Sequence, residues 1–289
     1  MSVEQLDDSA VTAAEVRAGG SVLPASGGPP LWLILALAAA YVVALAALAF
    51  LPGATLIERL RALDGGICAQ APSHSFFPGG QQLPLCSRNT GIYTGFAATF
   101  LTLWFTGRLR ASRFPGRWVI VVLAVAVLFM AEDGFNSMFL DLGLPHFYQP
   151  HNLLRLASGL GTGVAMCAFI VPVANTLIWR NEDERSVFSS LRQLAVMAPV
   201  LLLIFLMLAV WSQAAVLLYP IALFSTAGLV MALSLVNLVF VLGISSRVGR
   251  FAMWRQFFPF FTLALVFAVV ELLALFALKS SLMHTLGMA

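Results

Sequence analysis

Long apolar stretches separated by short polar segments dominate the sequence. A helix needs about 20 mostly apolar residues to cross roughly 30 Å of hydrocarbon. Seven stretches meet or nearly meet this length, and they are 31–51, 89–107, 118–140, 156–179, 193–219, 221–246 and 256–278. We therefore predict seven transmembrane helices, with Pro220 marking a short turn between two of them. Six is the alternative, because 118–140 contains Glu132 and Asp133 and could enter the membrane only in part.

The composition excludes a water-soluble fold. Of the 289 residues, 60% are hydrophobic and only 10% are charged, whereas soluble chains carry about 25% charged residues. Disordered and disulfide-rich classes are excluded for the same reason. Uninterrupted apolar runs favour helices over the alternating strands of a barrel. The predicted fold is an all-α polytopic transmembrane bundle. The net charge of +3 is scattered over short loops, so no nucleic-acid partner is expected.

The arginines indicate an orientation. The connections 108–117, 180–192 and 247–255 each hold three or more arginines, whereas 132–151 and 219–220 hold no Arg or Lys. Because basic loops stay in the cytoplasm, we expect the N-terminus inside and the C-terminus outside. The loop 52–88 is then extracytoplasmic, although it contains three arginines of its own.

Three regions are expected along the chain. Residues 1–30 lack the basic start and apolar core of a signal peptide and indicate a flexible cytoplasmic tail. A membrane core over 31–180 includes the extracytoplasmic loop, and 193–278 adds three further helices. The segment 181–192 separates the last two regions.

Charged side chains inside predicted spans need an explanation because burying them in hydrocarbon is costly. At 1.5 Å per residue, Glu132 and Glu271 lie roughly 21 and 22 Å from the cytoplasmic ends of their helices. Asp133 and Arg155 fall at a similar level, and Asn152 shares a helix face with Arg155. We predict a polar cavity in the outer third of the bilayer. The alternatives are a structural ion pair between Glu271 and Arg155, and acids that only mark the membrane edge.

Small and polar residues in the spans indicate helix packing. Gly91 with Gly95, and Gly159 with Gly163, are pairs at four-residue spacing that allow helices to approach closely. Asn237 and Ser225 are expected to form hydrogen bonds between helices.

The loop 52–88 holds the candidate chemistry outside the membrane. Cys68 and Cys86 either form a disulfide, which an oxidising compartment favours, or remain free thiols. Cys167 lies within a span and is expected to be inert. No C-x-x-C motif is present, which gives little support to a thioredoxin-like role. His74 could act as a base or metal ligand, or it could be a solvated loop histidine.

Short motifs in this region resemble a known family. They are Cys68, Gln70, Ser75-Phe76-Phe77, Gly79-Gly80, Leu83-Pro84-Leu85-Cys86, Arg88, Thr90-Gly91-Ile92-Tyr93, Gly95-Phe96, Asp133-Gly134, Asn152, Arg155 and Gly159. Over about residues 65–175 the chain resembles the uncharacterised prokaryotic membrane proteins numbered twenty eighty-five in the domain-of-unknown-function series. The resemblance implies a multi-pass protein of the prokaryotic inner membrane. It implies no established activity.

Two departures from that family's pattern affect the cysteines. The pattern has a histidine where this chain has Ala69, and a further cysteine where it has Asn89. Three cysteines and a histidine would suit zinc. With two of the four ligands absent, no metal or other cofactor is expected, and the disulfide between Cys68 and Cys86 is favoured.

These features lead to three hypotheses for function. The first is an outward-facing pocket that transports or handles a lipid or a small anion, with Arg88, Asn152 and Arg155 as ligands and Asp133 and Glu271 as counter-charges. The second is a non-catalytic subunit that docks on a membrane partner through 193–278. The third is a membrane enzyme that uses His74 and Asp133. An enzyme is the less favoured class, because no nucleophile or metal motif is present.

Overall fold

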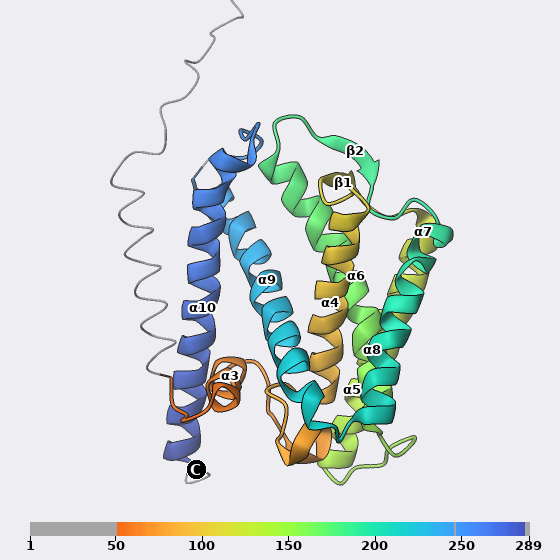
Figure 1. Ribbon diagram of the computed structural model, residues 1–289, viewed down its shortest axis with the longest axis vertical. Helices are drawn as coiled ribbons and strands as arrows, with labels where there is room; N and C mark the ends of the chain where they lie inside the picture. The colour runs from red at the N-terminus through yellow and green to blue at the C-terminus, as the bar shows by residue number, and fades with distance from the viewer. Residues whose placement is uncertain (1–50, 246, 287–289) are drawn as a thin grey trace, which may run out of the picture.

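The computed structural model describes residues 51–286 except Ser246. Most of this part of the chain is helical, which confirms the all-α prediction. The long helices are α4 (Ser87–Phe105), α5 (Arg117–Asp141), α6 (Asn152–Ile178), α8 (Met197–Trp211), α9 (Leu218–Ile244) and α10 (Trp254–Thr285). Each runs antiparallel to the next along the chain (Figure 1). The expected tail 1–30 and span 31–51 lie outside the described residues.

Five of the described helices are long and apolar enough to cross a membrane. They cover Arg117–Asp141, Asn152–Ile178, Leu191–Trp211, Ala215–Ile244 and Gln256–Thr285. The span predicted at 89–107 is also helical, as α4. It is not among the five because Ser, Asn, Thr and Gly are frequent along it. The structure thus supports a multi-pass membrane protein, while the number of seven spans stays a prediction.

Two details of the predicted spans are settled by the helix boundaries. Helix α5 continues without a break through Glu132 and Asp133 to Asp141, so 118–140 is helical over its whole length. The turn predicted at Pro220 is wrong: the chain turns at 212–217, which includes the 3₁₀ helix η3 (Ala215–Leu217), and Pro220 lies in the first turn of α9. Proline is tolerated there because backbone N–H groups of the first turn have no helical partner.

Helix α4 lies at the centre of the bundle, against α6 and α9. The predicted glycine pairs allow this contact. A Cβ atom on Gly163 would lie 2.1 Å from the Ile92 carbonyl oxygen, and one on Gly91 would lie 2.4 Å from the Leu156 oxygen. No side chain fits at such distances, so glycine lets the α4 and α6 backbones touch. The packing interpretation of the glycines is confirmed.

The loops gather at two ends of the bundle. At one end the strands β1 (Ala111–Arg113) and β2 (Asp183–Ser186) pair in parallel, close to the short helix α7 (Leu191–Ala195). A further parallel bridge joins Trp179 to Phe251. The arginine-bearing connections 108–117, 180–192 and 247–253 all lie at this end (Figure 1), and we call it the arginine end.

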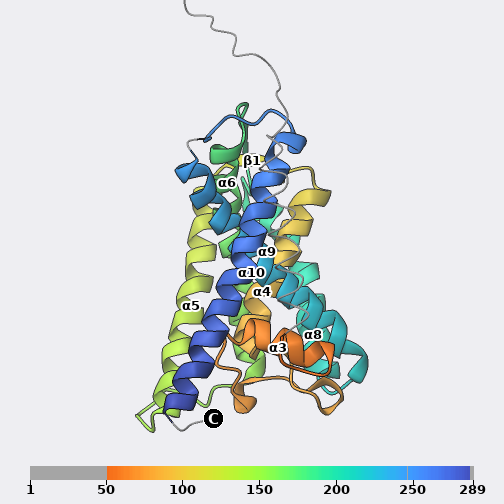
Figure 2. The same cartoon turned by 90° about the vertical axis from the view of Figure 1, so that its left-hand side faces the viewer.

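The opposite end carries the cysteine loop. Helix α3 (Leu56–Asp64) begins with a capping box between Thr55 and Glu58 and packs against α10 (Figure 2). The 3₁₀ helices η1 (Pro72–His74) and η2 (Pro78–Gly80) follow in the loop before α4. The N-termini of α4 and α6 and the C-terminus of α5 reach this end, so it holds most of the residues predicted to form the polar cavity, but not Glu271.

Candidate functional site

Four of the predicted site residues come together where α4, α5 and α6 meet. Arg88 forms an ion pair with Asp133, with 2.5 Å between Nη2 and Oδ2. Arg155 donates to the Asn152 side-chain oxygen at 2.9 Å. The Ser137 hydroxyl accepts from Arg88 at 3.2 Å and from Arg155 at 3.4 Å, and so links the two arginines. We call these five residues the outer network.

The outer network is covered by a loop that the sequence did not single out. Tyr148 donates its hydroxyl proton to Asp133 at 3.0 Å and also lies 3.4 Å from Glu132. Asn136 holds the loop through hydrogen bonds with the Tyr148 carbonyl and the Phe147 amide. Partial burial, with Asp133 and Glu132 nearby, raises the pKa of Tyr148, which therefore stays a neutral donor.

Helical spacing in the sequence is enough to group two of these residues with Asp133. Asn136 and Ser137 follow Asp133 by three and four residues, so they lie on the same face of α5. Tyr148 carried no comparable signal, because its position depends on the path of the loop.

His74 and Glu132 lie at the edge of the outer network. His74 Nε2 is 3.3 Å from the Asp141 carboxylate, and Asn152 donates to the neighbouring Ser75 carbonyl. Burial lowers the pKa of His74, and the nearby positive charge of Arg155 adds to the effect. His74 is therefore neutral near pH 7. Glu132 is exposed on α5.

Glu271 does not belong to the outer network. Its carboxylate accepts a hydrogen bond from Asn237 of α9 at 3.2 Å. The structural pairing of Glu271 with Arg155 is therefore wrong, because Arg155 is bound to Asn152 and Ser137. The interhelical hydrogen bond expected of Asn237 is confirmed. Ser225 instead donates to the Ala222 carbonyl of its own helix.

Cys68 and Cys86 are neighbours and both are free thiols. The backbone N–H of Cys86 donates to the Cys68 sulfur at 3.2 Å. The disulfide between them is absent from the structure and stays a prediction. Within residues 51–286 apart from Ser246, no three His, Cys, Asp or Glu side chains are placed to hold a metal ion.

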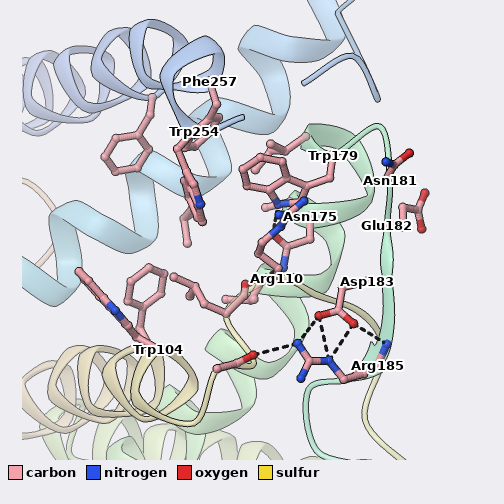
Figure 3. A pocket seen from close by; sticks show the side chains of 18 of the residues that line it. Trp104, Arg110, Asn175, Trp179, Asn181, Glu182, Asp183, Arg185, Trp254 and Phe257 are labelled. Carbon is pink, nitrogen blue, oxygen red and sulfur yellow. Dashed lines mark hydrogen bonds and ion pairs between the residues drawn. The ribbon is translucent and has the colours of Figure 1, made fainter. Parts of the chain in front are cut away.

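A cavity of about 1110 Å³ lies at the arginine end. Figure 3 shows its aromatic wall and the polar side chains beside it. Helices α4, α6, α9 and α10 and the connections around β1 and β2 contribute to the lining. The aromatic members are Phe100, Trp104, Trp179, Trp254, Phe257, Phe258 and Phe261. No sequence pattern predicts this cavity, because these side chains come from segments far apart in the chain.

Arg110 is held at the wall of the cavity. Its guanidinium carbon lies 4.0 Å from the centroid of the Trp179 ring, a cation–π distance. Asn175 fixes both groups: it donates to the Leu109 and Ala111 carbonyls at 2.8 Å and accepts from the Trp179 indole N–H at 3.0 Å. Arg110 Nε is buried with no hydrogen-bond partner among the described residues.

A second arginine at the rim is already neutralised. Arg185 binds the Asp183 carboxylate through Nε and Nη2, the latter at 2.6 Å, and also donates to the Gly107 carbonyl. This hydrogen bonding lowers the pKa of Asp183, which is therefore charged near neutral pH. The pair carries no net charge, whereas Arg110 keeps an unused donor beside apolar walls.

The comparisons concern mainly the half of the chain that contains the outer network. A family described as predicted membrane protein (DUF2085) matches residues 68–169. An uncharacterised protein of Methanocaldococcus jannaschii is 30% identical over 115 residues, which cover 40% of this chain and 68% of that protein.

An uncharacterised protein of Methanothermobacter thermautotrophicus is 30% identical over 115 residues, which cover 39% of this chain and 90% of the relative. No solved structure matches the chain. The matched residues run from Cys68 through α4 and α5 into α6 and include all five members of the outer network. The chain belongs to this family of predicted membrane proteins.

Proposed function

We propose that this membrane protein binds an anionic lipid in the cavity at the arginine end and takes part in lipid handling or transport. The observation that carries the proposal is the combination of an apolar, aromatic-lined cavity with the unused Arg110 donor at its wall. Lipids combine an acyl chain with a charged head group, and the cavity offers a complementary surface to each.

The apolar part of the site suits an acyl chain. The volume of about 1110 Å³ slightly exceeds the range of about 300–1000 Å³ typical of small-molecule pockets. Trp104 and Phe258 line the cavity and are also exposed on the outer surface of the bundle. They are placed where membrane lipid would surround the helices. A chain could then enter sideways from the bilayer.

The charges at the same end suit an anionic head group. The partly buried Arg110 forms no ion pair among the described residues, and its Nε is a buried donor without a partner. Such a guanidinium favours a phosphate or carboxylate ligand, because its donors form charge-assisted hydrogen bonds. Arg108, Arg113, Arg180 and Arg247 add positive charge at this end of the bundle. Basic pockets between helices on the cytoplasmic side are a recurrent way to bind anionic lipids, which fits the orientation expected from the arginines.

Lipid binding to the purified protein tests the proposal. Native mass spectrometry in neutral detergent would compare phosphatidylglycerol with phosphatidylcholine. We expect tighter binding of phosphatidylglycerol and a loss of ten- to a hundredfold in Arg110→Gln, since a charge-assisted hydrogen bond contributes about 1.5–3 kcal/mol. Arg117→Gln is the matched control, because Arg117 lies at the same end and also stacks on a tryptophan, Trp118.

Blocking the cavity gives a second test. Ala252→Trp places a large side chain on the lining and should weaken binding of both lipids. Val236→Trp adds the same bulk on an exposed face of α9 and should have no effect. Equal binding of the two lipids by the wild-type protein, or unchanged binding in Arg110→Gln, would refute the proposal.

The outer network supports the outward-facing anion pocket as a second candidate. The network holds two arginines and one fully buried carboxylate, Asp133, which pairs with Arg88 only. The Nε atoms of Arg88 and Arg155 are buried without partners among the described residues. A small anion such as phosphate would compensate the second positive charge. Isothermal titration with phosphate tests this reading: binding that Arg155→Gln abolishes supports it, and no measurable binding contradicts it.

The hypotheses of a membrane enzyme and of a docking subunit have less support. The enzyme hypothesis needs a free acid at Asp133, and this carboxylate is paired with Arg88 and covered by Tyr148. A docking role for 193–278 fits the many exposed apolar side chains of α8, but lipid contact explains them equally well. Co-purification of a protein partner in mild detergent would favour docking.

A further inference from the structure

The two loop cysteines lie where α3, the cysteine loop and α4 meet. Cys86 is the residue that precedes α4, and its backbone N–H points at the Cys68 sulfur. The two thiols differ in access: Cys68 is buried, with 3% of its surface exposed, whereas Cys86 is only partly buried. A reagent in solution would therefore meet the Cys86 sulfur first.

The surroundings of Cys68 stabilise a negative sulfur. The Cys68 sulfur accepts a hydrogen bond from the Cys86 backbone N–H at 3.2 Å. The Cys86 thiol, the Gln70 backbone and the Asn89 side chain also lie close enough to favour a negative charge on this sulfur. The sulfur also lies at the N-terminus of a 19-residue helix, where the helix dipole favours negative charge. These contacts lower the pKa of Cys68 to about 6, and they raise the pKa of Cys86.

A buried acid adjoins the pair. Asp64 is fully buried at the end of α3, and one carboxylate oxygen accepts a hydrogen bond from Thr226 at 2.7 Å. The other oxygen has no hydrogen-bond partner among the described residues. Burial raises the pKa of Asp64 to about 7, so much of this group is protonated near neutral pH. A neutral Asp64 does not repel a thiolate at Cys68.

We propose that Cys68 and Cys86 form a redox-active pair that exchanges with the dithiol–disulfide couple of another protein. In the oxidised form the two sulfurs are bonded. A partner thiolate attacks the Cys86 sulfur, a bond forms between partner and Cys86, and the bond to Cys68 breaks. Cys68 leaves with the electron pair as a thiolate.

The second half of the exchange completes the transfer. The partner's second thiolate attacks its own sulfur in the mixed disulfide and releases Cys86, which takes a proton from solvent. Two electrons have then passed from the partner's dithiol to this pair, and the reverse sequence oxidises the pair at the expense of a partner disulfide. Stabilisation of the leaving thiolate accelerates reduction and makes the disulfide easier to reduce.

Single-cysteine variants test the roles of the two sulfurs, with glutathione as the probe. In a Cys167→Ser background, Cys68→Ser leaves Cys86 alone and Cys86→Ser leaves Cys68 alone. After incubation of the folded protein with oxidised glutathione, we expect mass spectrometry to find the mixed disulfide on Cys86, because the loss of Cys68 removes the main cause that raises the pKa of Cys86 and because Cys86 is the less buried residue. We expect Cys68 to stay unmodified. Modification of Cys68 in preference to Cys86 would overturn the assignment.

The equilibrium with glutathione separates a redox-active pair from a structural disulfide. In the Cys167→Ser protein, the Cys68–Cys86 pair should change from disulfide to dithiol as the ratio of reduced to oxidised glutathione in the buffer increases. Alkylation of the free thiols measures the fraction that is reduced. Asn89→Leu removes a polar side chain that favours the Cys68 thiolate, and it should shift this equilibrium about tenfold towards the disulfide. Asn181→Leu, an exposed position at the arginine end of the bundle, should leave it unchanged. A disulfide that resists reduced glutathione, or thiols that oxidised glutathione never joins, would overturn the proposal.

Discussion

Asp133→Asn should destabilise the bundle far more than Glu132→Gln, although the two acids are adjacent on α5. Asp133 is completely buried and binds Arg88 at 2.5 Å and Tyr148 at 3.0 Å. Glu132 is exposed, and its carboxylate has one long contact, 3.4 Å, with Tyr148. The substitutions remove the same charge from neighbouring positions, so their difference isolates the effect of burial.

The expected magnitude follows from the partner that remains. Removing one member of a buried ion pair costs about 3–5 kcal/mol, because the other charge stays buried without compensation. The Arg88 side chain keeps 21% of its surface exposed, which places the cost at the lower end, about 3 kcal/mol. Glu132→Gln should change stability by less than about 0.5 kcal/mol, as is usual for exposed sites.

Unfolding of the purified protein by increasing fractions of sodium dodecyl sulfate in mixed micelles measures both values. Circular dichroism at 222 nm follows the helices, and the unfolding free energies of the two variants are compared with that of the wild type. A double substitution, Arg88→Met with Asp133→Leu, should recover part of the loss, because neither charge then remains buried. Equal stability of Asp133→Asn and Glu132→Gln would refute the reasoning and indicate that Arg88 is satisfied by another partner.

Two further predictions concern the pH dependence and the helix contact. Burial raises the pKa of Asp64 to about 7 from an ordinary value of 3.8, because the folded protein favours the protonated carboxyl group. The stabilisation that protonated Asp64 gives the folded state is therefore complete below pH 4 and is lost as the pH rises through 7. Asp64→Asn should flatten the pH profile of the unfolding free energy, removing a decrease of up to about 4 kcal/mol, and an unchanged slope would contradict the burial argument. Gly163→Ala should cost about 1–3 kcal/mol by forcing α4 away from α6, whereas Gly243→Ala, with open space around it, should cost nothing. Thermal unfolding followed by tryptophan fluorescence compares the two, and equal melting temperatures would contradict the close-contact interpretation.

The sequence predicted the helices and part of the outer network for physical reasons that act locally. Long apolar runs identify helices whatever their neighbours are. The scarcity of charge made Asp133 and Arg155 conspicuous, and their similar depth brought them correctly to one level. Depth alone does not give the direction in which a side chain points. The predicted grouping of Glu271 with Arg155 is therefore wrong, and Glu271 meets Asn237 on α9 instead.

The cavity at the arginine end could not be predicted in the same way. Its walls combine Trp104, Trp179 and Trp254, which are separated by about 75 residues each in the sequence and meet only when α4, α6 and α10 pack. In the sequence, Arg110 is one of the four arginines of the connection 108–117, and it indicates only orientation. What distinguishes it is a tertiary contact, the stacking on Trp179 and the fixing of both groups by Asn175.

The contact between α4 and α6 connects the two candidate sites. Gly91 and Gly163 fix how far apart the two helices lie and how they are aligned lengthwise, because the backbones touch at these points. Arg88 and Arg155 extend from the same two helices at one end, and Trp104 and Asn175 extend from them at the other. A change that separates α4 from α6 should therefore disturb both the outer network and the cavity. A change on α5, which joins only the outer network, should leave lipid binding at the arginine end intact.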